Sequence, residues 1–498
     1  MKINQIMASG LKLLLLVALL FPPQVFAGER AAQKAFDRVK HDPVGLRGFL
    51  QNFPKGGDLH NHIDGAVYAE NMIVWAGADG KCIDLSSYQI QAAPCDAEQG
   101  RPSLADIAMN GDRVNEIVDA FSVRNYARRE ISGHDQFFST FFKFDLATHG
   151  REGNMIAEVT QRAANQNTYY LELMQSWGMA NARATAALSE AAQENRIDEI
   201  TSESMAVLDR AEQRRRDLQF CEQAQSSNAC DVQVAYIAQV IRVFPRDQVR
   251  AQVKLATRLV ERDPRVVGIT FVAPEDAPST LLDYAWQMQM LAQETKRLPE
   301  AIRNINLHAG ELSLGLVTPE HLGWHIRDAI EVAGSNRIGH GVDIIYDPDR
   351  EQLLDYMASN KIAVEINLTS NGVILDIAED EHPFNLYRQH AVPICLSTDD
   401  EGVLRTDLTQ QYQRAVLSYD LDYQDIKQFA RNALAFNFQS GDSLFADLTH
   451  GVYVPPCRKL KVGKAAAPEC SAYMAASSKA RLQWGLEKRF YNFEKKYH

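Results

Sequence analysis

The chain has 498 residues, enough for one large domain with insertions or for two to three domains of ordinary size. Hydrophobic residues make up 46% of it, so it can bury a sizeable core. The formal net charge of −12 at pH 7 argues against binding to nucleic acid backbones or to anionic membrane surfaces. We therefore expect neither nucleic acid nor a membrane surface among the partners of this chain.

The N-terminus has the pattern of a secretory signal peptide. Lys2 and Lys12 precede an apolar run over residues 13–21, and Val25-Phe26-Ala27 forms a small-residue cleavage site. The alternative is a membrane anchor, but this run is far shorter than the roughly 20 residues that span a bilayer. We predict that residues 1–27 are removed and that the mature protein is periplasmic or secreted.

Eight short apolar or β-branched runs, each followed by a longer helical pattern, recur from Gly57 onward. They are residues 58–63, 169–174, 232–241, 266–272, 305–310, 337–342, 362–368 and 392–398. Strands that alternate with helices indicate a parallel sheet, and eight such units predict an α/β fold with a closed (β/α)8 TIM barrel.

The barrel is expected over residues 28–446, a range much longer than the roughly 250 residues that this fold needs. We therefore predict two insertions after the first strands, at about 77–150 and 176–230. Residues 447–498 are predicted to form a C-terminal extension that ends in an amphipathic helix. The apolar residues of that helix are Leu482, Leu486, Phe490 and Phe493.

Six of the seven cysteines form three close couples along the chain. The couples are Cys82 with Cys95, Cys221 with Cys230, and Cys457 with Cys470, and Cys395 stands alone. Six cysteines can pair in fifteen ways, so we predict disulfides between neighbours as one hypothesis among these. Short loops closed by disulfides are compatible with an oxidising compartment.

Polar motifs lie where several of the predicted strands end. KGGDLHNHIDGA at 55–66 places His60 and His62 two residues apart, so both point to one face of an extended segment. HAGE at 308–311, RIGHG at 337–341 and STDD at 397–400 follow later strands. Because the catalytic groups of such barrels come from the carboxyl ends of several strands, we expect these motifs to form one site.

Each of these motifs also has a purely structural interpretation. His308 can cap a helix, His340 can be a packed core histidine, and Asp399 can be the N-cap of the helix that begins near Leu408. All of these interpretations would have to hold at once, each at the end of a barrel strand. A shared site explains the motifs more simply.

Three histidines and one aspartate in these motifs suit a single zinc ion per chain. His60, His62, His308 and Asp399 offer three nitrogens and a carboxylate oxygen, and a water would complete the coordination. Such an ion lowers the pKa of its bound water to about 7. Glu311, three residues after His308, suits an acid–base group that is not a ligand.

With these motifs the sequence resembles the adenosine deaminases of the metal-dependent amidohydrolase superfamily. The likeness includes PKGGDLHNHIDGA, VVGITFVAPE, HAGE, RIGHG, LTSN, STDD and residues 408–434, and it covers most of residues 53–440. The signal peptide and the extra length are similar to those of the secreted members. The resemblance implies zinc-dependent deamination of adenosine or deoxyadenosine to inosine or deoxyinosine and ammonia.

The resemblance also implies a role for each matching residue. The three histidines and Asp399 would bind zinc, and Glu311 would protonate the purine at N1. His340 would orient and help deprotonate the zinc-bound water that attacks C6. Asp400 would contact N7 of the purine, and Asp64 the ribose.

Three features depart from this pattern or allow another interpretation. Ala273 stands where a glycine of the family offers its backbone to the purine, which places that contact in question. Glu401 replaces the proline that follows the two aspartates, and the effect of this change on the mouth of the site is left open. The segment FFSTFFKF at 137–144 resembles a wall of the purine pocket, but we interpret aromatic residues at this helical spacing as core.

Two other functions remain open. One keeps the chemistry and changes the substrate to adenine, a modified nucleoside or another aminopurine. The other is an extracellular nucleoside-binding protein without turnover. Glu311 and His340 argue against the second, since binding alone needs neither a proton donor nor a group that orients water. The oligomeric state is open as well.

Overall fold

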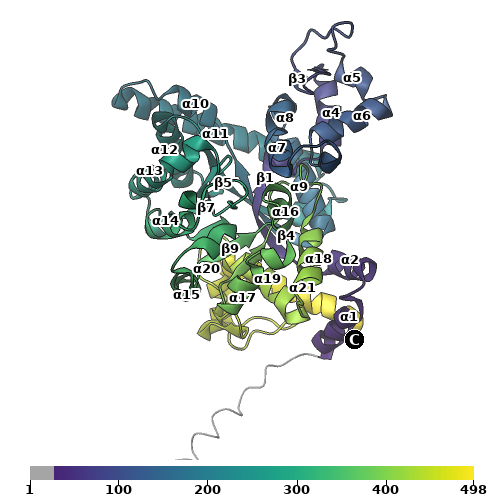
Figure 1. The fold of residues 1–498 in the computed structure, drawn as a ribbon. Coiled ribbons are helices and arrows are strands. Elements are labelled where there is room, and N and C mark those ends of the chain that lie inside the picture. The colour runs from purple at the N-terminus through teal and green to yellow at the C-terminus, as the bar shows by residue number, and fades with distance from the viewer. Residues whose placement is uncertain (1–26) are drawn as a thin grey trace, which may run out of the picture.

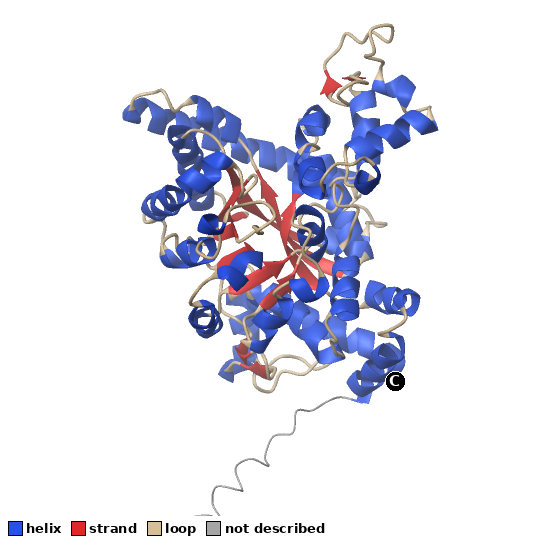
Figure 2. Ribbon diagram, in the orientation of Figure 1, coloured by secondary structure: helices blue, strands red, loops and turns tan. Residues whose placement is uncertain are grey.

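Eight parallel strands form the centre of the molecule, shown in red in Figure 2. The computed structural model describes residues 27–498, so the predicted signal peptide lies outside the described residues except for Ala27. The strands are β1 (Gly56–His62), β4 (Thr168–Gln175), β5 (Gln233–Ile241), β6 (Val266–Val272), β7 (Asn306–Ala309), β8 (Arg337–His340), β9 (Ala363–Ile366) and β10 (Ile394–Leu396). Each of the eight predicted strands is confirmed.

The strands pair in chain order around a ring. They form two parallel sheets, β1-β4-β5-β6 and β7-β8-β9-β10. A parallel bridge from Ile269 to Ile305 joins β6 to the start of β7, and a second bridge from Asn61 to Asp399 joins β1 to the segment after β10. Neighbouring strands therefore pair all the way round, which is the arrangement of a (β/α)8 barrel.

An outer ring of helices covers the strands (Figure 1). Its principal members are α9 (Glu152–Asn165), α11 (Glu190–Leu218), α12 (Arg246–Arg262), α13 (Pro278–Thr295), α14 (His325–Glu331), α15 (Arg350–Asn360), α17 (Phe384–Gln389) and α19 (Tyr423–Ala435). Since both faces of a parallel strand are covered in this arrangement, most residues of the strands are buried. Every residue of β4 is buried, for example.

The segment predicted as the first insertion projects from the barrel at the upper right of Figure 1. It begins at the end of α4 (Ala69–Ala78) and includes the two-stranded hairpin of β2 (Cys82–Ile83) and β3 (Ile90–Gln91). The bond between Cys82 and Cys95 closes this part. It continues through α5 (Leu104–Ile107), α6 (Gly111–Ala120), α7 (Gly133–Phe138) and α8 (Phe141–Thr148).

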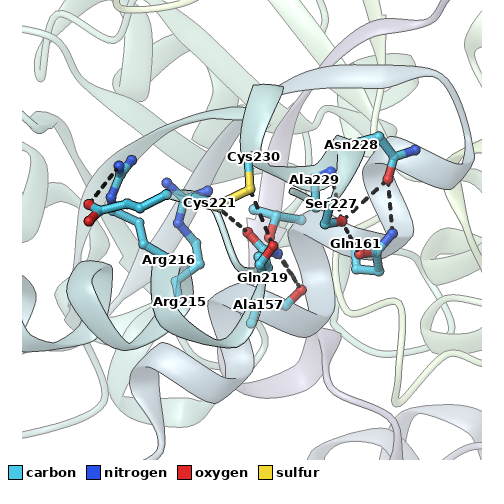
Figure 3. The surroundings of a disulfide bond; sticks show 12 residues. Ala157, Gln161, Arg215, Arg216, Gln219, Cys221, Ser227, Asn228, Ala229 and Cys230 are labelled. Carbon is cyan, nitrogen blue, oxygen red and sulfur yellow. Dashed lines mark hydrogen bonds and ion pairs between the residues drawn. A yellow bond between two sulfur atoms is a disulfide. The ribbon is translucent and has the colours of Figure 1, made fainter. Parts of the chain in front are cut away.

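Most of the segment 176–230 is one helix of the outer ring. After the short α10 (Met179–Ala184), the 29-residue helix α11 packs against α9 and α12. A bond between Cys221 and Cys230 closes the turn that leads from α11 to β5 (Figure 3). Beside it, Gln219 Nε2 donates to the carbonyl of Ala157 at 3.0 Å, which ties this turn to α9.

The C-terminal residues pack against the barrel rather than extend from it. They form β11 (Phe445–Asp447), β12 (Val452–Tyr453), α20 (Pro468–Ala476) and α21 (Ser478–Glu494), with a bond between Cys457 and Cys470. The four apolar residues predicted on the last helix are buried in α21, which lies against α19 and the N-terminal helix α1 (Ala27–Val39). Helix α2 (Pro43–Asn52) leads from α1 into the first strand.

Two further findings concern the described part of the chain. The three disulfides join the neighbouring cysteine couples, as predicted. Cys395 is buried in β10 and is the one cysteine among residues 27–498 outside a disulfide. Across the same residues, no helix combines the length and the apolar character needed to cross a bilayer.

Candidate active site

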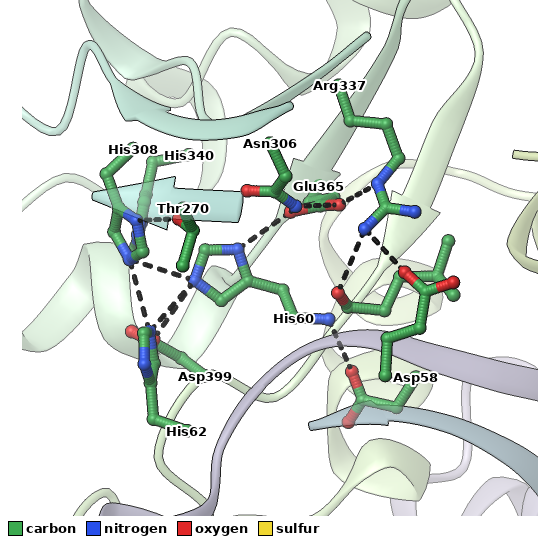
Figure 4. Close-up of polar contacts among 12 residues, drawn as sticks. Asp58, His60, His62, Thr270, Asn306, His308, Arg337, His340, Glu365 and Asp399 are labelled. Atoms are coloured by element: carbon green, nitrogen blue, oxygen red, sulfur yellow. Dashed lines mark hydrogen bonds and ion pairs between the residues drawn. The ribbon is translucent and has the colours of Figure 1, made fainter. Parts of the chain in front are cut away.

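Three histidines and an aspartate meet at the carboxyl ends of the barrel strands, His60 and His62 from β1, His308 from β7 and Asp399 from the segment after β10 (Figure 4). Nε2 of His308 lies 3.1 Å from Nε2 of His60 and 3.1 Å from Nε2 of His62, and the last two atoms are 3.3 Å apart. Asp399 Oδ1 lies 3.3 Å from Nε2 of His60 and 3.2 Å from Nε2 of His62. Backbone bonds between Asp399 and β1 hold the aspartate in place, because its N–H donates to the carbonyl of His60 and its own carbonyl accepts from His62.

The other ring nitrogen of each of two histidines is held by an acceptor. His60 Nδ1 lies 2.8 Å from a carboxylate oxygen of Glu365, and His62 Nδ1 lies 2.8 Å from the amide oxygen of Gln239. Burial raises the pKa of Glu365, but the positive charge of Arg337 outweighs this and keeps the pKa below its ordinary value. Glu365 is therefore ionised and accepts a hydrogen bond from Nδ1 of His60. Both histidines therefore carry their proton on Nδ1 and turn the lone pair of Nε2 inward.

This geometry fits a metal ion. Two inward lone pairs 3.3 Å apart, next to a carboxylate oxygen, repel one another unless a cation lies between them. Ligand atoms about 2.0–2.1 Å from a tetrahedral zinc ion are separated by roughly 3.3 Å, close to the distances found here. His340 also has a ring nitrogen within 4.8 Å of the donor atoms of His60, His308 and Asp399.

Glu311 lies beside this cluster and is buried, with 7% of its surface exposed. One of its carboxylate oxygens is 3.5 Å from Nδ1 of His340. Burial raises the pKa of Glu311 well above its ordinary value, and the negative charges of Asp399 and Glu275 raise it further. Such a carboxyl group can hold a proton at neutral pH and donate it.

Glu275 fixes the backbone that carries Glu311. Its two carboxylate oxygens accept from the N–H groups of Gly310 at 3.0 Å and Glu311 at 2.7 Å, and it also contacts His325 Nδ1 at 2.5 Å. Glu275, Glu365 and Gln239 were not predicted from the sequence as residues of the site. For Glu365 a signal existed, because a lone carboxylate in the apolar strand IAVEINL has to be paired when it is buried.

The two aspartates assigned to the substrate lie at the same end of the barrel. Asp64, in the first turn of α3 (Ile63–Ala66), accepts from Gln175 Nε2 at 3.2 Å, and burial raises its pKa to about 6. Asp400 is 2% exposed, and its Oδ1 has no hydrogen-bond partner among the described residues. A Cβ atom on Gly65 would come within 1.6 Å of this oxygen, so the glycine permits the close approach of α3 to Asp400.

A cavity of about 710 Å³ opens above these residues. It is lined by residues from several strand ends and from α7 and α8, among them His62, Asp64, Ala273, His308, Glu311, His340, Asp399 and Asp400. Phe137, Phe138, Phe141 and Phe144 also line it. The interpretation of that segment as core alone is therefore wrong: Phe137 and Phe144 are buried in the core, but α7 and α8 turn this aromatic cluster toward the cavity as well.

The lining of the cavity is acidic. Asp145 and Glu152 are acidic neighbours of Asp64. Burial is the largest cause of the raised pKa of Asp64, and the negative charges of these two neighbours raise it further. Glu203 lies on the same lining. The residues that line the cavity, all in the described part of the chain, include neither lysine nor arginine. An anionic group on a ligand would therefore meet carboxylates rather than cations.

The segment after Asp400 turns away from the cavity. Glu401 is buried and accepts from Nε of Arg162 at 2.9 Å, so it pairs with α9 and is not part of the cavity lining. The N-cap of α18 (Leu408–Ser418) is Asp407, whose side chain accepts from the N–H of Gln410, and Asp399 has no such role.

Ala273 lines the cavity with φ of +95°, a conformation that favours glycine. Ala273→Gly is expected to raise the free energy of unfolding by up to about 1 kcal/mol, because the relief of strain exceeds the entropy that glycine gains in the unfolded chain. Ala358→Gly in the interior of α15 should lower it by about 0.5–1 kcal/mol. Urea unfolding measures both, and a loss of stability in Ala273→Gly as large as in the control would contradict this account of the strain.

The comparisons with known proteins agree with this geometry. The family model described as adenosine deaminase matches residues 154–449, which is more than half of the chain. The adenosine deaminase of Vibrio cholerae is 34% identical over 151 residues, which are 30% of this chain and 41% of that protein. That of Vibrio parahaemolyticus is 36% identical over 148 residues, 29% of this chain and 40% of that protein. These alignments thus span less than half of either relative.

Solved structures share the fold. The adenine deaminase of Arthrobacter aurescens superposes with a TM-score of 0.51 at 16% identity, over 78% of this chain and 94% of that one. The apo N6-methyl-AMP deaminase of Arabidopsis thaliana superposes with a TM-score of 0.52 at 23% identity, over 79% of this chain and 94% of that one. With the family match and the site described above, this chain belongs to the adenosine deaminase family.

Proposed function

We propose that this protein is a zinc-dependent deaminase that converts adenosine and deoxyadenosine to inosine and deoxyinosine with release of ammonia. One zinc ion per chain would be held by His60, His62, His308 and Asp399. The observation that carries the proposal is the position of Glu311, a buried carboxyl group beside the metal-binding cluster and open to the same cavity. A protein that only binds nucleosides has no need for this proton donor.

Each residue of the site has a task in this reaction. Glu311 gives its proton to N1 of the purine, which makes C6 more electrophilic. Asp400 contacts N7 and Asp64 the ribose, so the two aspartates orient C6 toward the histidine cluster. His340 orients the water that adds to C6. When bound, zinc supplies the positive charge that makes a water nucleophilic at neutral pH.

Nucleotides are the main alternative substrates, since solved structures of this fold include an N6-methyl-AMP deaminase and complexes with GMP and IMP. A 5′-phosphate in the present cavity would lie against Asp64 and its neighbours Asp145 and Glu152. The negative charges of these carboxylates would repel the phosphate and oppose binding of a nucleotide. An arginine or lysine side chain would be needed to offset this repulsion. The acidic lining therefore favours nucleosides.

A substrate panel tests this specificity. We expect ammonia release from adenosine and deoxyadenosine and a much lower kcat/KM with AMP. Asp64→Asn keeps the size of the side chain and removes one negative charge, so the ratio of AMP to adenosine kcat/KM should rise roughly tenfold, equivalent to about 1.4 kcal/mol. Adenine tests the need for a sugar. AMP turned over as well as adenosine by the unmodified protein would refute the assignment of Asp64 to the ribose.

We also propose that the protein acts outside the cytoplasm, in the periplasm or beyond it. The leader-like sequence of residues 1–27 and the three bonded cysteine pairs support this location. Cell fractionation with N-terminal sequencing of the recovered protein tests it, and a cytoplasmic protein that keeps residues 1–27 would overturn it.

A further inference from the structure

Two buried residues with no task in the mechanism above connect His340 to a backbone amide. The N–H of Phe384 donates to Nδ1 of His382 at 3.1 Å. Nε2 of His382 lies 3.1 Å from Oδ1 of Asn371, and Nδ2 of Asn371 lies 3.0 Å from Nδ1 of His340. His340 and Asn371 are completely buried, and His382 is 4% exposed. The three side chains thus form one chain of hydrogen bonds from the start of α17 to the cavity.

The direction of this chain is set at its far end. A backbone N–H can only donate, so Nδ1 of His382 has no proton, and its imidazole carries the proton on Nε2. Burial lowers the pKa of His382 to about 3, and the charge of Arg414 acts in the same direction, in keeping with a neutral ring. His382 therefore donates from Nε2 to Asn371.

The orientation of Asn371 follows from that of His382. The amide oxygen of Asn371 accepts from His382, so its NH₂ group faces Nδ1 of His340 and donates to it. Nδ1 of His340 is then an acceptor, and the neutral ring has its proton on Nε2. This Nε2 is buried without a hydrogen-bond partner among the described residues, and His340 lines the cavity.

We propose that Asn371 and His382 are positioning residues that hold His340 in the tautomer with the proton on Nε2. His340 then offers a hydrogen-bond donor to the oxygen that adds to C6, an inference that rests on the proposed deaminase function. A ring in this state cannot accept a proton at Nε2, so it does not help to deprotonate the water, as the resemblance to the family implied. Its contribution is to donate to a lone pair of the attacking oxygen and so to fix the position of that oxygen at C6. A protonated Nε2 is also no metal ligand, which separates His340 from the three histidines of the metal cluster.

The tautomer can be measured without turnover. In zinc-loaded protein with ¹⁵N-labelled histidine, the nitrogen signals of His340 are identified by their absence in His340→Gln. We expect a protonated Nε2 and an unprotonated Nδ1. Asn371→Asp replaces the donor with an acceptor of the same size, so Nδ1 of His340 should become protonated.

The kinetic consequence is a loss of rate rather than of binding. In the serine protease triad, the wrong histidine tautomer lowers kcat by roughly 10⁴, so Asn371→Asp is expected to lower kcat by about 10²–10⁴. KM should change less than about threefold, because the donor acts on the attacking water and not on the purine or the ribose. A residue that merely stabilises the fold would not change the nitrogen signals of His340 in this way.

A second pair of variants does not touch His340. His382→Gln retains an acceptor for Phe384 N–H and a donor for Asn371, so the tautomer and most of the rate should remain. His382→Glu offers only acceptors, so Asn371 should turn its amide over and His340 should become protonated on Nδ1. These two variants decide the question if Asn371→Asp does not fold.

The outcomes separate this proposal from the proposed function. A proton on Nδ1 of His340 in the unmodified protein, or unchanged His340 signals in His382→Glu, would overturn the positioning role. If the signals switch as expected but no aminopurine is deaminated by the unmodified protein, the positioning role stands and the proposed function fails.

Discussion

Replacing Glu311 with glutamine is expected to leave zinc bound and to lower the rate of deamination by about 10²–10⁴, the usual cost of losing a general acid. Glutamine keeps the size of the side chain and most of its hydrogen bonds, but it has no proton to give to N1. The donor atoms of the metal cluster belong to His60, His62, His308 and Asp399, and Glu311 is not among them.

Zinc content and turnover are to be measured on the same purified Glu311→Gln protein. Glu494→Gln is a matched control, because Glu494 is similarly buried, at 5% exposure, but lies in α21 and binds Lys427. It should keep both zinc and turnover. A Glu311→Gln protein with one zinc per chain and nearly normal turnover would show that Glu311 is not the proton donor.

His308→Ala is expected to remove zinc and to abolish turnover. Nε2 of His308 is 3.1 Å from those of both His60 and His62, so its loss opens one corner of the cluster. Two histidines and Asp399 then remain, at positions arranged around an ion that His308 also holds, so zinc should be bound much more weakly. The buried histidines would also lose the cation that offsets the repulsion between their lone pairs.

The zinc content and the turnover of the purified His308→Ala protein test this prediction. Circular dichroism shows whether the variant is folded. His450→Ala serves as the control, since His450 is an exposed histidine of the C-terminal segment. Retention of one zinc per chain and of turnover in His308→Ala would mean that His308 is not a ligand.

The sequence by itself determined the strands and the residues that gather at the candidate site. The apolar runs predict strands because both faces of a parallel barrel strand are covered, and all eight agree with the structure. His60, His62, His308, Glu311 and Asp399 stand out because they lie at or just after strand ends, where such barrels carry their reactive groups. In both cases the information is local, a periodicity or a motif of a few residues.

Other features depend on contacts between distant parts of the chain, and only the tertiary structure decided them. Glu401 pairs with Arg162, 239 positions away, so its effect on the mouth of the site was not predictable from its neighbours. Phe137, Phe138, Phe141 and Phe144 line the cavity and also pack against the core because of where α7 and α8 return to the barrel. Helical spacing shows that such residues share a face, but not what that face meets.

The same distinction holds inside the site. Spacing indicated that His60 and His62 point the same way, but the bridge between β1 and the segment after β10 brings Asp399 to them. The proton positions of His60 and His340 depend on Glu365 and on Asn371, which come from the region of β9. A hydrogen bond is directional and acts over about 3 Å, so the state of each histidine is decided by whichever partner the fold brings within that distance.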